Sequence, residues 1–199
     1  MRKYLALIFI TISCFTSLAQ ENLTLDTLKD FKNIKFLHAH GKNFDTVTYS
    51  RYAISKVVGE PYYQIDKEIN SYWDMDLIYG AKINNVDTLP QNQFFPPIEL
   101  INSEEISYSL NNRNYKVLKH IDRNCYDPLC GSRHSHVTHI TGVTYFSPDF
   151  GILFRGRNGN VTLEMMVSIE GTVLPRELII QILKEQNISD EIIEKYKSL

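Results

Sequence analysis

The sequence has no lysine- or arginine-rich run, and its 21 basic and 23 acidic side chains give a net charge of −2 at pH 7. Covering a phosphate backbone requires an excess of positive charge, so this composition argues against nucleic-acid binding. The motifs G-x-S-x-G, H-E-x-x-H, G-x-x-x-x-G-K-S/T and G-x-G-x-x-G are also missing. These absences favour a non-enzymatic protein over the hydrolase, metalloprotease and nucleotide-binding classes.

Long hydrophobic runs are missing too, with one exception at the N-terminus. Residues 4–15 form a mostly apolar run of about 12 residues, whereas a membrane-spanning helix needs roughly 20. Two basic residues precede the run, and the small residues Ser17 and Ala19 follow it in the pattern of a signal-peptide cleavage site. We therefore expect residues 1–19 to be a signal peptide, and residues 20–199 to form one periplasmic or secreted β-rich domain.

The alternative for the leader is a lipoprotein signal, in which Cys14 becomes the lipid-bearing first residue. Thr11 stands where such signals carry an aliphatic residue, so the signal peptide is favoured. Its removal leaves 19 basic and 23 acidic residues, and 19 minus 23 is a net charge of −4. No later segment of the sequence is long and apolar enough to predict a transmembrane helix.

Cysteine is scarce: the chain has three, and only Cys125 and Cys130 follow the leader. An even number in an exported protein favours a disulfide bond, because that compartment is oxidising. The turn-forming pair Asp127-Pro128 lies between them, so the bond would close a tight loop. A cysteine-based zinc site is the less favoured alternative, because only two cysteines remain and their spacing closes a loop.

Alternating apolar and polar residues predict that most of the mature chain is β-strand. The pattern is clearest in residues 71–84 and 161–169, where the apolar side chains share one parity. Weaker versions occur at residues 45–58, 61–69, 105–110, 113–121, 134–146 and 150–156. Turn signals separate these segments closely, which favours antiparallel neighbours, since parallel strands need long crossovers. The proline-rich segment 89–100 is predicted to be a loop.

Two helices are predicted at the C-terminus, over residues of about 175–197. Pro175 suits a first helical turn, and Ser189 is the predicted N-cap of the second helix. Four apolar residues of the first helix share one face: Leu178, Ile179, Ile182 and Leu183. Residues 23–31 are ambiguous between helix and strand. The predicted class is mainly β (α+β), an antiparallel sheet with the two helices packed on one face or end.

The histidines are the candidate metal ligands. His38 and His40 form one H-x-H pair, and His134 and His136 form another. Residues i and i+2 of a strand point to the same side, about 6.5–7 Å apart, so a pair could hold Zn or Cu, and neighbouring strands could bring all four together. The alternative is that they are ordinary polar strand positions, because H-x-H specifies geometry only loosely.

Strand register bears on the second histidine pair. Parity places His139 on the face opposite that pair. If the strands pair across the Cys125–Cys130 loop, Lys119 lies opposite His136, and its ammonium group would repel a metal ion. A slip of one residue would reverse this arrangement.

The chain is rich in aromatic residues, with 12 tyrosines and 10 phenylalanines but one tryptophan. Four of them lie close together: Tyr62, Tyr63, Tyr72 and Trp73. Tyrosine and tryptophan supply a large contact area with a polar group, so this cluster is a candidate site for an apolar or sugar-like ligand. The alternative is the general preference of aromatic residues for strands.

Residues 155–160, RGRNGN, combine two arginines with two glycines. A strand is predicted before this segment and another after it, at residues 161–169. We therefore interpret the segment as the end of a strand and a hairpin loop rather than as a phosphate-binding loop.

One segment carries a resemblance to known proteins. Residues 143–154, VTYFSPDFGILF, resemble a strand–turn–strand of small uncharacterised secreted proteins of Gram-negative bacteria, with the pattern Y-x-S-P-D/E-F/Y-G. The matching residues are Tyr145, Ser147, Pro148, Asp149, Phe150 and Gly151. The resemblance implies an exported β-rich domain with a curved, half-barrel-like sheet open to a ligand, and no known activity.

Together these features predict an exported, non-enzymatic binding or cell-envelope accessory domain. Its partner would be an apolar or sugar-like ligand or an envelope protein, with no cofactor. The alternative is a small Zn- or Cu-binding protein or a metalloenzyme that uses an H-x-H pair.

Overall fold

The computed structural model describes residues 25–58, 62–70, 72–79, 98–124, 140–157 and 160–199. They form nine strands and two helices: β1 (Leu25–His40), β2 (Asn43–Val57), β3 (Tyr62–Ile69), β4 (Tyr72–Tyr79), β5 (Ile98–Leu110), β6 (Arg113–Asn124), β7 (Ile140–Ser147), β8 (Gly151–Arg157), β9 (Thr162–Ser168), α1 (Arg176–Glu185) and α2 (Asp190–Lys197). The strands make one antiparallel sheet in the order β4-β3-β2-β1-β9-β8-β7-β6-β5. The predicted class, a mainly β fold with two C-terminal helices packed against an antiparallel sheet, is confirmed.

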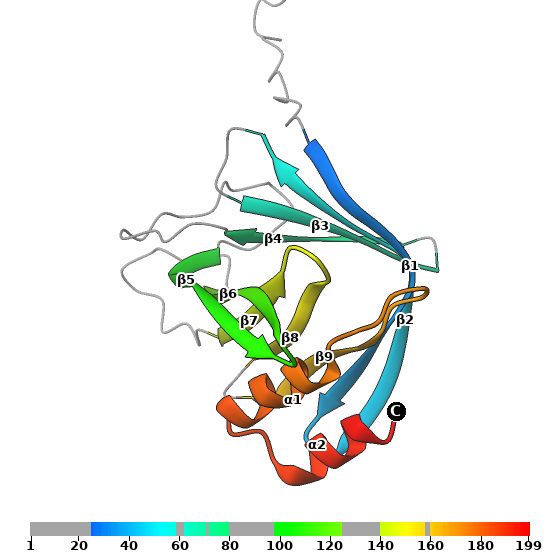
Figure 1. Ribbon diagram of the computed structural model, residues 1–199, viewed down its shortest axis with the longest axis vertical. Coiled ribbons are helices and arrows are strands. Elements are labelled where there is room, and N and C mark those ends of the chain that lie inside the picture. The colour runs from blue at the N-terminus through cyan, green and yellow to red at the C-terminus, as the bar shows by residue number, and fades with distance from the viewer. Residues whose placement is uncertain (1–24, 59–61, 71, 80–97, 125–139, 158–159) are drawn as a thin grey trace, which may run out of the picture.

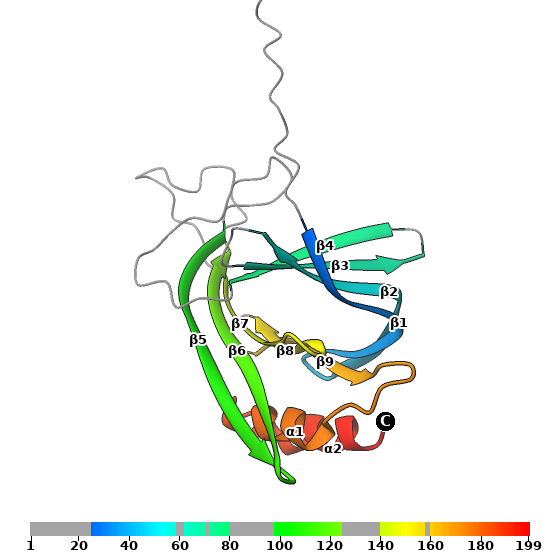
Figure 2. The same cartoon turned by 45° about the horizontal axis from the view of Figure 1, so that its top comes forward.

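The sheet is strongly curved (Figure 1). Strands β5 and β6 form one wall, β1 and β2 form the opposite wall, and β7, β8 and β9 connect them, while β3 and β4 lean over the concave side (Figure 2). Among the described residues, β4 and β5 are the edge strands and do not pair with each other. The sheet is therefore an open half-barrel rather than a closed barrel.

Aromatic side chains fill part of the concave side and tie distant strands together. The backbone N–H of Ile152 in β8 donates to the hydroxyl of Tyr52 in β2, at 2.9 Å. The ring of Tyr63 in β3 lies 5.0 Å from that of Phe146 in β7, measured between centroids. Gly151 has φ +95°, and a Cβ there would lie 2.5 Å from the Tyr52 ring, so only glycine fits this turn.

The two helices cover the outer face of the sheet below β7–β9 (Figure 2). The four predicted apolar residues of α1 are fully buried, and each such burial contributes about 1.5–3 kcal/mol. Tyr196 of α2 donates to the carbonyl of Met166 in β9, at 2.9 Å. Gln186, after α1, donates to the hydroxyl of Tyr145 in β7, at 2.8 Å. Among the described residues, no helix has the length and apolar character that crossing a bilayer requires.

Three local predictions need correction or completion. The ambiguous segment 23–31 is strand over its described part, and β1 continues to His40. Its second half escaped prediction because it is buried on both faces, which removes the alternation. Strand β5 begins at Ile98, inside the predicted loop. Lys119 pairs with Tyr145 and not with His136, because β6 pairs with residues 140–146.

Candidate functional site

A row of polar residues crosses the concave face of the sheet. Directly opposite residues of antiparallel strands share one side, and successive pairings bring six polar residues into one line. We call these six residues the polar row: His38, Glu164, Arg155, Thr144, His120 and Ser103, in β1, β9, β8, β7, β6 and β5 respectively.

One end of the polar row is sealed from solvent. Ser103, His120 and Thr144 are fully buried, and Arg155 donates from Nε to Thr144 Oγ1 at 3.3 Å. Burial and, to a smaller extent, the positive charge of Arg155 together lower the pKa of His120 to about 4. His120 is therefore neutral at physiological pH, as a buried imidazole beside a guanidinium must be.

The other end of the polar row opens into a pocket of about 240 Å³. The side chain of His38 is 37% exposed and that of Glu164 is 13% exposed, so the pocket is partly open to solvent. Eight residues from β1, β2, β3, β8 and β9 line it: His38, Tyr49, Lys67, Arg155, Arg157, Thr162, Leu163 and Glu164. Lys67 pairs with Tyr52, which fills the concave side, so the pocket lies inside the curl.

Positive charge predominates among the described residues that line the pocket. Lys67, Arg155 and Arg157 are cationic, and Glu164 alone is anionic. Lys67 is only 2% exposed, and its Nζ lies 5.3 Å from the centroid of the Tyr49 ring, within the range of a cation–π interaction. Arg155 Nη1 lies 3.5 Å from Glu164 Oε2. The pocket thus suits a ligand that is polar and carries negative charge.

The other oxygen of Glu164 faces a histidine. Oε1 of Glu164 lies 3.9 Å from Nε2 of His38, which is too far for a hydrogen bond. Both atoms are shielded from solvent, and neither has a hydrogen-bond partner among the described residues. If the partly exposed His38 ring turns to admit it, an oxygen atom between them could lie about 2.8 Å from each, so a single hydroxyl group would satisfy both.

The first H-x-H pair lies beside this pocket. His38 pairs with Glu164 and His40 with Thr162, so both histidines point to the concave side as predicted for one strand face. His40 Nδ1 lies 3.0 Å from Thr162 Oγ1. No group of three or more His, Cys, Asp or Glu residues suited to a metal ion occurs within the described ranges. Metal binding by His38 and His40 stays a prediction.

The aromatic candidates are only partly described. Tyr63 is half-buried against Phe146, and Tyr72 is exposed at the start of β4. Tyr62 and Trp73 lie in β3 and β4, but their side chains lie outside the described set. Cys125, Cys130, His134 and His136 also fall outside the described residues. The disulfide, the second histidine pair and the aromatic ligand site therefore remain predictions.

The two arginines of the pocket were misjudged from sequence. Arg155 and Arg157 both lie in β8, which runs to Arg157, so the strand extends beyond the predicted residue 156. They pair with Glu164 and Thr162, and both face the pocket. The available signal was the R-x-R spacing, which places two guanidinium groups on one strand face.

Comparison with known proteins found no match to this chain among protein families, curated proteins or solved structures. The resemblance to secreted Gram-negative proteins therefore stays a prediction. The strand–turn–strand that it implies is present: Phe150 N–H donates to the carbonyl of Ser147 at 3.2 Å, between β7 and β8.

Proposed function

We propose that this protein is an exported binding domain that holds a small polar ligand inside its half-barrel. The observation that carries the proposal is the pocket where the polar row opens, with Lys67, Arg155 and Glu164 charged and largely shielded from water. Removing charges from water is costly, and a buried ion pair is seldom a net gain in stability. Charges kept at such a place are best explained by recognition of a ligand.

Binding rather than catalysis is proposed because the described lining residues are of the kind that fix a ligand in place. Arginine and lysine donate hydrogen bonds to anionic groups, and tyrosine adds a flat contact surface with a polar edge. The sequence also lacks the nucleophile, metalloprotease and nucleotide motifs considered above. An envelope protein remains the alternative partner, through the outer rim of the same half-barrel.

A binding screen with a blocked pocket tests this proposal. The full chain, purified without its leader from the exported fraction, is screened by thermal shift against sugars, sugar acids, organic acids, phosphates and amino acids. A ligand at 100 times its Kd stabilises a protein by about 2.7 kcal/mol, which raises Tm by several degrees. Thr162→Trp should fill the pocket and remove the shift, whereas the exposed neighbour Val161→Trp should keep it.

Two results of this screen would contradict the proposal. A screen in which no compound raises Tm, or a shift that Thr162→Trp leaves intact, would show that this pocket is not a binding site.

The metal-binding alternative rests on His38 and His40, which share the concave side of β1. A divalent ion there would meet Arg155 and Arg157 of β8, which line the same pocket, and like charges repel. Metal analysis of untagged protein, with His38→Ala/His40→Ala alongside, separates the two proposals. Stoichiometric Zn or Cu that disappears in the double variant would favour the metal proposal over the polar-ligand proposal.

A further inference from the structure

We infer that the ligand is a hydroxylated anion of monosaccharide size, such as a sugar acid or a sugar phosphate. Its anionic group would lie against Arg155, Arg157 and Lys67, and one of its hydroxyl groups would lie between His38 Nε2 and Glu164 Oε1. This inference rests on the proposed function, because it names the ligand class of the same pocket.

The size of the pocket limits the ligand. Its volume is about 240 Å³. Pockets for drug-sized ligands span about 300–1,000 Å³. The pocket therefore suits a ligand, or the end of a ligand, of about the size of one sugar unit.

The arginines supply the anionic half of the site. Arg155 and Arg157 occupy alternate positions of β8 and point to one side, about 6.5–7 Å apart at the backbone. A guanidinium carries five N–H donors in a planar fork that matches carboxylate and phosphate oxygens. Arg155 is held in orientation by Thr144 and Glu164, so its position does not depend on the ligand. Lys67 approaches from β3 on the other side of the curl.

His38 and Glu164 supply the hydroxyl half. Glu164 Oε1 can only accept a hydrogen bond when ionised, and His38 Nε2 donates or accepts according to its tautomer. A hydroxyl both donates and accepts, so one hydroxyl group can donate to Glu164 while it contacts His38. A second anionic group would be repelled by Glu164 at this position. The two halves together select a molecule that is charged at one end and hydroxylated at the other.

Four probes of similar size separate these requirements in calorimetric titrations of the full mature chain. D-glucuronate carries a carboxylate and hydroxyls, and D-glucose 6-phosphate carries a phosphate and hydroxyls. D-glucose has the hydroxyls without the charge, and cyclohexanecarboxylate has the charge without the hydroxyls. We expect at least one of the first two to bind ten times more tightly than both of the last two. The affinity should fall as NaCl is raised, because salt screens ion pairs.

Two variants, each with a matched control, test the anion-binding half and the hydroxyl-binding half of the site separately. Arg157→Gln should weaken binding of the preferred anion at least tenfold, while Lys42→Gln, which removes an exposed cation outside the pocket, should not. His38→Leu should weaken the same anion at least tenfold and leave cyclohexanecarboxylate unchanged. His40→Leu, on the same strand but outside the lining residues, is its control. Both test positions are partly exposed, so folding is expected to survive and is checked by circular dichroism.

The results distinguish this inference from the proposed function. If neither hydroxylated anion binds, or if D-glucose binds as tightly as the better of the two anions, the ligand class is wrong. The same holds if Arg157→Gln leaves binding unchanged. In each case the proposed function survives as long as Thr162→Trp still abolishes the binding of some other ligand. If Thr162→Trp abolishes nothing, the proposed function falls as well.

Discussion

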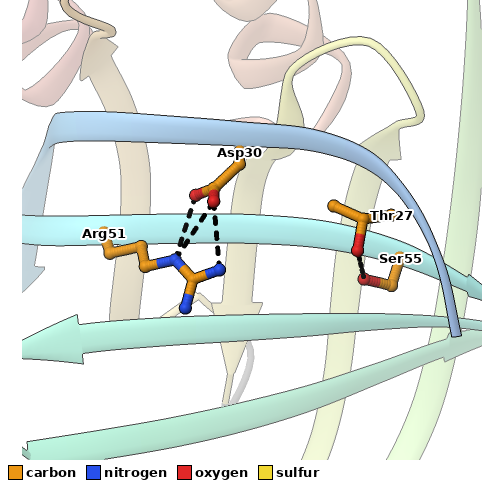
Figure 3. A network of polar contacts seen from close by, with 4 residues as sticks. All are labelled: Thr27, Asp30, Arg51 and Ser55. Atoms are coloured by element: carbon orange, nitrogen blue, oxygen red, sulfur yellow. Dashed lines mark hydrogen bonds and ion pairs between the residues drawn. The ribbon is translucent and has the colours of Figure 1, made fainter.

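Among the described residues, two arginine–carboxylate pairs that link neighbouring strands of the sheet lie in opposite environments. Arg51 of β2 donates three hydrogen bonds of 3.0–3.2 Å to Asp30 of β1, and both side chains are nearly half exposed (Figure 3). Hydrogen bonding to Asp30 raises the pKa of Arg51. Arg155 approaches Glu164 through one pair of atoms at 3.5 Å, and both side chains are almost buried.

The two ion pairs differ in hydrogen-bond geometry and in what they contribute to stability. The exposed pair has the better geometry, yet surface ion pairs add little to stability because water and salt screen them. The interior pair has the poorer geometry and bears the cost of leaving water, which the attraction within a buried ion pair often does not repay. Charges held in so costly a place fit the proposed role in ligand recognition.

Neutralising one carboxylate in each pair should give the largest contrast. Glu164→Gln leaves the Arg155 charge in the interior and should lower the free energy of unfolding by about 2–3 kcal/mol, the lower end for a broken buried pair because the pocket is partly open. Asp30→Asn should change stability little, and still less in 0.5 M NaCl. Urea denaturation of both variants at two salt concentrations measures this. Equal effects from the two variants would remove the distinction between the pairs.

Buried His120, at the solvent-shielded end of the polar row, should make the free energy of unfolding depend on pH. His120 has a folded-state pKa of about 4, and an unfolded histidine titrates near 6.5, so between these values the unfolded chain binds more protons. Stability from this group is complete above pH 6.5 and is lost as the pH falls towards 4. The expected loss between pH 7 and pH 5 is about 2 kcal/mol for this shift.

Two variants attribute that loss to its source. His120→Gln should flatten the profile between pH 7 and 5, whereas His40→Gln, next to the pocket mouth, should not. An NMR titration of the wild-type imidazoles gives the same information without a variant. A His120 pKa near 6.5 would contradict the expected burial of a neutral ring.

Two threonine variants should show the smallest difference in stability. Thr144→Val removes a buried hydrogen bond, the one that Arg155 Nε donates to Thr144 Oγ1, and should cost about 1 kcal/mol. Thr162→Val removes the contact with the exposed His40, where water can replace it, and should cost almost nothing. The midpoints of urea denaturation compare them, and a larger loss for Thr162→Val would mean that the pocket end is the more rigid one.

Much of the fold could be predicted from local patterns. Residues 161–169 alternate and contain β9 (Thr162–Ser168), and the four apolar residues of α1 share the face that is buried. The second half of β1 was missed because Phe36 and Leu37 are both buried, on opposite faces of the strand. Of the residues in the candidate site, only His38 was predicted from the sequence. The H-x-H spacing predicted it as a metal ligand and not as part of a polar pocket.

The amino-acid sequence by itself determined most of the strands, the terminal helices and the excess of acidic over basic residues, because alternation, turn residues and charge are local properties. Only the tertiary structure decided that His38 lies beside Glu164, 126 positions further along the chain, and that Glu164 lies beside Arg155. That choice depends on which strands pair and in which register, and a slip of one residue would turn every one of these side chains to the other face. The pocket exists because β1 pairs with β9 and the sheet then curls around that line.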